Sequence, residues 1–80
     1  MTRQPRTFVV FGFPSVHDTL AAEDALKRSG VPATTIPTPH ELGELCGIAI
    51  RVEPGHASAA EEALVRGGAP ASARAEITDL

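Results

Sequence analysis

The chain has 80 residues, which is enough for one small domain and leaves little room for a deep pocket. Its hydrophobic content is 42% and its formal net charge is -3. These values are ordinary for a soluble globular protein, and without a basic excess nucleic acid is not expected as the main partner. The longest apolar run, residues 8–13, is too short for a membrane span or a signal-peptide core, so no membrane association is expected.

Cys46 is the only cysteine, so the fold cannot depend on an internal disulfide, and a cytoplasmic location is expected. The three histidines and Cys46 lack the close paired spacing of metal ligands, so no metal is predicted. Gly12 stands alone rather than in a phosphate-binding loop, and no cofactor is expected. The sequence shows no serine, histidine and acid arrangement, so an independent hydrolase is not indicated.

The first half of the chain predicts a strand, a helix and a short strand. Residues 1–6 are expected to form a flexible tail, and residues 7–80 a single domain. Residues 7–13 are rich in β-branched and aromatic side chains and are apolar on both faces, as in a strand that is covered on both sides. Ser15 and Asp18 form a capping-box pattern at the start of a helix. We expect that helix to end at Ser29 and Gly30 and a second strand to follow over residues 31–36.

The segment after the second strand repeats the pattern of a helix start. Thr38 has the side chain of an N-cap, Pro39 suits the first helical position, and Glu41 completes a capping box. This pattern predicts one or two helical turns that end near residues 43–45.

The second half of the chain predicts two more strands around a second helix. Residues 47–52 alternate large and small side chains, which predicts a third strand with Ile48, Ile50 and Val52 on the core face. Residues 57–66 predict a helix with a further capping pattern at Ser58, and residues 71–78 predict a weak edge strand.

The element order βαββαβ indicates the class of the fold. Each strand–helix–strand unit prefers a right-handed crossover, which places both helices on one face of the sheet. We therefore predict an α+β, ferredoxin-like two-layer sandwich whose antiparallel sheet has the strand order 4-1-3-2.

This topology predicts the surroundings of Cys46. Because the third strand runs antiparallel to the first two, segments 13–17, 36–39 and 45–47 are expected to meet at one edge of the sheet. Cys46 would then lie near the N-terminus of the first helix, where unpaired backbone N–H groups stabilise a thiolate.

Four residues complete the candidate site around the thiol. Ser15 and His17 start the helix that would stabilise a thiolate, Thr38 lies in the converging segment, and Gly47 would leave clearance beside the sulfur. The short helix after Pro39 opposes this effect because its negative end, and the carboxylates Glu41 and Glu44, are near Cys46. A purely structural role of Cys46 as a small buried hydrophobic residue stays open, and so does a solvated His17.

With these residues in view, the sequence resembles the bacterial selenium/sulfur carrier protein-like family. The resemblance covers nearly the whole ordered chain. It rests on residues 13–18 (Phe-Pro-Ser-Val-His-Asp), Ala22-Glu23, residues 36–39 (Ile-Pro-Thr-Pro) and residues 46–51 (Cys-Gly-Ile-Ala-Ile-Arg). Where basic residues often follow the Pro-Thr-Pro segment in such proteins, this chain has His40, Glu41 and Glu44.

The resemblance implies a carrier function in which Cys46 holds sulfur or selenium as a persulfide or selenosulfide. The implied partners are a donor enzyme such as a cysteine desulfurase and an acceptor enzyme. Two alternatives remain open: an interaction or ligand-sensing module with a structural Cys46, and a redox sensor that uses the same thiol. The contact surface of an interaction module, including a homodimer, would be formed by Gly47, Ala49 and apolar residues of the first strand.

Overall fold

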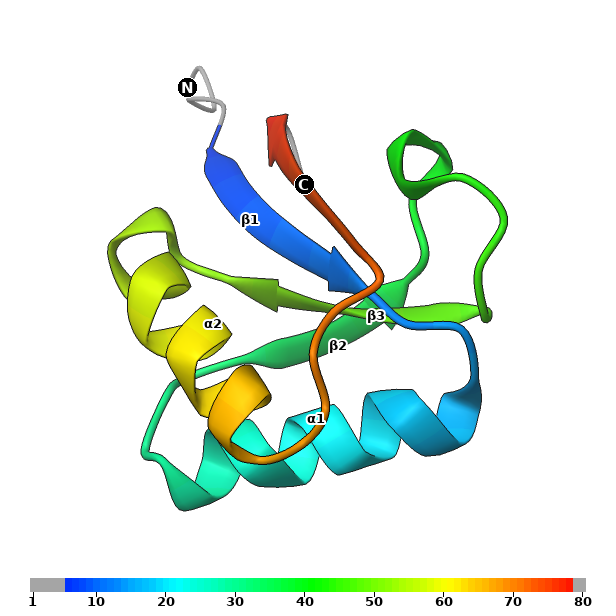
Figure 1. Ribbon diagram of the computed structural model, residues 1–80. Coiled ribbons are helices and arrows are strands. Elements are labelled where there is room, and N and C mark those ends of the chain that lie inside the picture. The colour runs from blue at the N-terminus through cyan, green and yellow to red at the C-terminus, as the bar shows by residue number, and fades with distance from the viewer. Residues whose placement is uncertain (1–5, 79–80) are drawn as a thin grey trace.

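The computed structural model describes residues 6–78 and shows a four-stranded sheet with two α-helices (Figure 1). Of the predicted flexible tail, residues 1–5 lie outside the described residues, as do residues 79–80. Within residues 6–78, no helix has both the length and the apolar character needed to cross a membrane. The elements in chain order are β1 (Thr7–Gly12), α1 (Val16–Arg28), β2 (Thr34–Pro37), η1 (His40–Leu42), β3 (Ile48–Val52), η2 (Pro54–His56), α2 (Ala57–Arg66) and β4 (Ala73–Thr78).

The sheet has the order β2-β3-β1-β4, and all neighbouring strands are antiparallel. Read from the opposite edge, this is β4-β1-β3-β2, the strand order that the sequence predicts. The central strand β1 places Phe11 opposite Ile50 of β3 and Arg74 of β4. The domain is therefore an α+β fold with four antiparallel strands and two helices.

The main core lies between the sheet and the two helices, which pack on one face of the sheet (Figure 1). Alternate residues of β1 and β3 point into it, because successive side chains of a strand face opposite sides. The helices contribute small residues, which allow close approach to the sheet. The principal buried members are Val9, Phe11, Phe13, Ala22, Leu26, Ile50, Val52, Ala60 and Leu64.

The opposite face of the sheet has a second, smaller core, which is covered by the loop between β2 and β3. Val10, Ala49 and Ile77 of the sheet are buried together with Leu42 of η1. Gly12 permits this cover, because a Cβ there would overlap Cδ1 of Leu45 and lie 3.1 Å from Cδ1 of Leu42. Both faces of β1 are thus buried, as its apolar sequence predicts.

The start and end of α1 confirm the predicted helix signals. The hydroxyl of Ser15 accepts a hydrogen bond from the backbone N–H of Asp18 at 3.1 Å, as an N-cap does. At the other end, Gly30 has a φ of 71°, the left-handed conformation that glycine adopts without steric cost.

Two boundaries around β2 differ from the prediction. The backbone N–H of Val31 donates to the carbonyl of Leu26 at 2.9 Å, so this residue belongs to the helix end, and β2 begins only at Thr34. Thr38 is not an N-cap: η1 follows Pro39 without a side-chain cap, and the Thr38 hydroxyl donates instead to the carbonyl of Cys46. The predicted capping box at Thr38 was therefore wrong, because the hydroxyl of Thr38 donates its hydrogen bond to the carbonyl of Cys46 and does not cap the start of η1.

The second helix agrees with the predicted span but not with the predicted cap. It occupies Ala57–Arg66, and Ser58 lies inside its first turn. The single 3₁₀ turn η2 leads directly into it, and His56 occupies the N-cap position without a side-chain hydrogen bond.

Candidate functional site

The main chain of Cys46 is held by two segments that are distant from each other in the sequence. Its N–H donates to the carbonyl of Phe13 at 3.2 Å, and its carbonyl accepts from the hydroxyl of Thr38 at 2.5 Å. The N–H of Thr38 also donates to the carbonyl of Gly47 at 3.1 Å. The predicted convergence of the end of β1, the end of β2 and the start of β3 is therefore present in the structure.

The sulfur of Cys46 lies between a carbonyl and a hydroxyl. Its Sγ donates to the carbonyl of Ile48 at 3.0 Å and lies 3.2 Å from Oγ1 of Thr19. The residue is half-buried and its thiol is free. Because a carbonyl can only accept a hydrogen bond, the thiol is the donor in its contact with Ile48.

Thr19 is the site residue that the sequence analysis missed. It is the fourth residue of α1, is fully buried, and also donates to the carbonyl of Ser15 at 3.0 Å. It shares the core face of α1 with Ala22 and Leu26, which follow at intervals of three and four residues. A hydroxyl within that apolar stripe is a signal in the sequence, because a buried hydroxyl needs a hydrogen-bond partner.

Ser15 and His17 do not contact the sulfur in the way that a thiolate stabiliser would. The side chain of Ser15 is occupied by Asp18, and only its carbonyl reaches Thr19. His17 is exposed, and no hydrogen bond joins it to Cys46 within residues 6–78. The start of α1 therefore reaches the thiol through the buried hydroxyl of Thr19.

Thr38 and Gly47 flank Cys46 in different ways. Thr38 is half-buried and fixes the carbonyl of Cys46, so it positions the thiol-bearing residue without touching the sulfur. Gly47 is exposed, and a Cβ placed on it would meet no described residue within 4 Å other than its chain neighbours Cys46 and Ile48. Space around the backbone therefore does not require glycine at this position.

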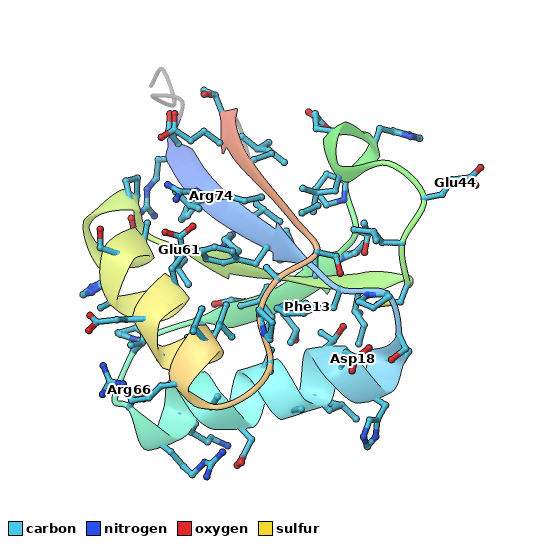
Figure 2. All side chains as sticks on the ribbon, viewed as in Figure 1. Phe13, Asp18, Glu44, Glu61, Arg66 and Arg74 are labelled. Atoms are coloured by element: carbon cyan, nitrogen blue, oxygen red, sulfur yellow. The ribbon has the colours of Figure 1, made fainter. Side chains whose placement is uncertain are left out.

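The ionisable side chains near Cys46 on the preceding loop and at the start of α1 are carboxylates and histidines. Glu41 and Glu44 are exposed on the loop that precedes Cys46, and Figure 2 shows Glu44 pointing away from the body of the domain. Asp18 lies at the start of α1, at the same end of the molecule (Figure 2). The η1 turn is only three residues long and ends before Gly43, so it brings a much weaker dipole than the predicted short helix.

The site offers a thiol rather than a cage for a metal. Within residues 6–78, no three His, Cys, Asp or Glu side chains gather closely enough to hold a metal ion. A groove of about 470 Å³ lies elsewhere, between α2 and the start of β4, and Cys46 is not among its lining residues. The chemistry that the arrangement around Cys46 can perform is therefore that of one free thiol on a half-buried residue.

Comparison with known protein families gives a match over most of the chain. The sequence model of the family described as "Putative Se/S carrier protein-like" matches residues 8–73, a span that includes β1 except its first residue, β2, β3, both helices and Cys46. The comparisons with curated proteins and with solved structures find no match.

Proposed function

Because the chain belongs to the Se/S carrier protein-like family, we propose that it carries sulfur or selenium on Cys46 between a donor enzyme and an acceptor enzyme. Cys46 is the only cysteine in the sequence, so a persulfide or selenosulfide can form only on its sulfur. The observation that carries the proposal is the combination of a fixed main chain with a free, half-buried thiol. Such a thiol is held in one place on a residue that is only partly covered by the rest of the chain.

We take the fold that presents this thiol to be of the ferredoxin-like type. The strand order and the antiparallel directions support this assignment, because β1 and β3 lie at the centre and each is followed by a helix. Cys46 lies just before the central strand β3, at the end of the sheet where β1 leads into α1. The residue that follows the thiol segment begins β3, and β3 is paired with a strand on each side, so the backbone next to Cys46 is fixed by the sheet.

Loading would be a thiol exchange that leaves the total oxidation state unchanged. The Cys46 thiolate attacks the outer sulfur of a donor persulfide, a new S–S bond forms, and the S–S bond of the donor breaks. The donor leaves as a thiolate, and the proton stays with the transferred sulfur. A donor with selenium in the outer position would give the S–SeH form in the same way. An acceptor nucleophile then attacks the outer atom, and Cys46 leaves as a thiolate.

The hydrogen bond from Cys46 to Ile48 must break before this attack. Loss of the proton removes the donor, and the carbonyl of Ile48 then repels the negative sulfur. The hydroxyl of Thr19 can turn from Ser15 towards the sulfur and donate to it, because it already lies 3.2 Å from Sγ. We therefore assign to Thr19 the role of positioning and stabilising the thiolate.

The alternative of an interaction module fits the structure less well. It would use Gly47, Ala49 and apolar residues of β1 as a contact surface. Ala49 and Val10 are completely buried in the second core under the loop that contains Leu42. They have no exposed area to offer a partner, so only Gly47 of the proposed contact surface is exposed.

Intact-mass measurement after incubation with a cysteine desulfurase and its substrate tests the proposal. With cysteine the chain should gain one sulfur atom, and with selenocysteine one selenium atom. Cys46→Ser should gain neither, and treatment with a reducing agent should reverse both gains. If the chain gains no atom under conditions that load a known carrier, the carrier function is excluded. A disulfide-linked dimer formed with peroxide, without loading by the desulfurase, would favour the redox sensor instead.

A further inference from the structure

The strand β4 has a free edge within the described part of the chain. It is the last strand in the order β2-β3-β1-β4 and pairs with β1 on one side only. An edge strand presents a row of backbone N–H and C=O groups to solvent and can pair with another strand. β4 has six residues and contains neither proline nor lysine, two residues that commonly protect an edge from such pairing.

The side chains of β4 divide into a charged side and an apolar side. Arg74 lies opposite Phe11 and Glu76 opposite Val9, so both charges project on the helix-covered face, where they are exposed. Ala73, Ala75 and Ile77 project on the other face and pack against the second core. Two charges of opposite sign thus stand on either side of Ala75.

We propose that two copies of this chain pair through the free edges of β4, antiparallel about a two-fold axis at Ala75. The spacing of the charges carries this proposal. In that register Ala75 faces its own copy, and Arg74 of each chain faces Glu76 of the other, so two attractive cross-strand pairs form. An axis at Arg74 or at Glu76 would instead place like charges opposite each other, which disfavours those registers.

The ion pairs within one chain do not prevent Arg74 and Glu76 from pairing with a second copy. Arg74 is held by Glu61 of α2 at 2.7 Å, and Figure 2 shows the two side chains facing each other. Glu76 forms no ion pair with any residue from 6 to 78. The second copy would therefore supply a cation for Glu76, which has none among residues 6–78, and a second carboxylate for Arg74.

The apolar surface beside β4 supports the same interface. The groove between α2 and the start of β4 is lined by Phe11, Leu64, Val65 and Ala73, among others, and Val65 is 68% exposed. This surface lies on the same side of the sheet as Arg74, next to the free edge. Pairing of two β4 edges would join the two sheets into one of eight strands, and its antiparallel direction would set the groove at the start of one β4 beside the end of the other.

The proposed dimer does not depend on the carrier function. Cys46 lies at the start of β3, and β1 separates that strand from β4. The axis at Ala75 therefore leaves both thiols outside the interface. A failure of dimerisation would leave the loading of Cys46 untouched, and a failure of loading would leave the dimer untouched.

Site-directed cross-linking tests the register. In the Cys46→Ser background, Ala75→Cys places two thiols on the axis, where Cα atoms of directly opposite residues are about 4.5–5.5 Å apart, within the range for a disulfide. Mild oxidation should give a covalent dimer. Thr78→Cys in the same background is the matched control, because the two copies of that residue would be about 20 Å apart along the strands. Equal cross-linking of the two variants, or none for Ala75→Cys, would overturn the register.

Charge reversal tests the interface without an added thiol. Sedimentation equilibrium under reducing conditions should show a reversible dimer, and Glu76→Arg should raise its dissociation constant by about tenfold or more. Arg74→Glu should weaken it in the same way, and the double variant Arg74→Glu/Glu76→Arg should restore much of the affinity. A chain that stays monomeric at every accessible concentration, or a dimer that neither reversal weakens, would overturn the proposal. Circular dichroism spectra confirm that each variant is folded.

Discussion

The hydroxyl of Thr19 has one proton and three acceptor atoms around it. The carbonyl of Ser15 is 3.0 Å away, Sγ of Cys46 3.2 Å and the carbonyl of Ile48 3.5 Å. While the thiol donates to Ile48, the Thr19 proton is best placed on Ser15. When the thiol ionises, the sulfur becomes the strongest acceptor of the three, because hydrogen bonds to charged groups are the stronger ones.

Replacement of Thr19 by valine tests this switch. Thr19→Val has nearly the same shape but removes the hydroxyl, so a Cys46 thiolate loses its donor. Alkylation of Cys46 by iodoacetamide at neutral pH should slow by about tenfold, the effect of one hydrogen bond to a charged group. The free energy of unfolding, measured in urea, should fall by only about 1 kcal/mol.

Two further variants make this prediction specific. Thr19→Ser keeps the hydroxyl and should be alkylated nearly as fast as the wild type. His17→Ala should also leave the rate unchanged, because His17 is exposed and does not reach the sulfur. If Thr19→Val reacts as fast as the wild type, the hydroxyl has no part in stabilising the thiolate.

At the scale of elements, the loop from β2 to β3 serves two purposes. Leu42 covers the second face of the sheet, and the last residues of the loop bring Cys46 to the end of β1. For both purposes the loop must pass close to β1 at Gly12, where Leu42 and Leu45 occupy the space that a side chain would fill. The position of the thiol is therefore coupled to packing on the far face of the sheet.

A methyl group at Gly12 should disturb this packing. The Cβ of Gly12→Ala would overlap Leu45, whose side chain is half-buried and has some room to move. We expect the free energy of unfolding to fall by about 1–2 kcal/mol, as for other cases of overpacking. Urea denaturation of the purified chain measures this change.

Gly47→Ala is the matched control, since its new methyl group would meet no described residue within 4 Å other than its chain neighbours. It should leave the free energy of unfolding nearly unchanged. Equal stabilities of Gly12→Ala and Gly47→Ala would show that the loop does not depend on its approach to β1. Slower loading of a stable Gly47→Ala variant would support the predicted clearance beside the sulfur.

The sequence predicts elements well where the deciding contacts are local. Ser15 caps α1 through Asp18, three residues away, and this short-range hydrogen bond is visible as a pattern. Thr38 has the same pattern, but its hydroxyl bonds to the carbonyl of Cys46, eight residues later. A capping residue and a residue that fixes a loop carry the same hydroxyl, so only the tertiary structure distinguishes them.

The same distinction applies to the candidate site. The convergence of three segments at Cys46 follows from strand directions, which the element order predicts. The contact between Cys46 and Thr19 depends on the rotation of α1 about its own axis and on the side-chain rotamer of the cysteine. Neither is set by strand order, so the sequence indicated the place of the sulfur but not its neighbours.

At the scale of the whole molecule, the charges are distributed unevenly. No lysine or arginine occurs among residues 7–26 or 29–50, the segments that contain the site, whereas these segments hold five carboxylates. The arginines are found elsewhere, with Arg66 and Arg74 on and near α2 (Figure 2). On the proposed function, a partner enzyme would approach Cys46 through a negative field, which favours a basic rim around the partner's own reactive sulfur.

This field predicts a salt dependence of loading. The rate of sulfur transfer from a desulfurase should fall as ionic strength rises, because screening weakens attraction between oppositely charged surfaces. The double variant Glu41→Lys/Glu44→Lys should load more slowly at low salt and lose most of that dependence. Its control is Glu62→Lys, which changes an exposed carboxylate on α2 and should behave like the wild type.

Stopped-flow mixing followed by intact-mass analysis measures the loading rates at each salt concentration. A rate that does not change with salt would contradict electrostatic steering while leaving the carrier function intact. Faster loading of Glu41→Lys/Glu44→Lys would have a different meaning: the carboxylates would then act mainly against the anionic sulfur of Cys46 itself. The salt series separates the two effects, because screening slows a steered encounter but relieves repulsion between acidic groups.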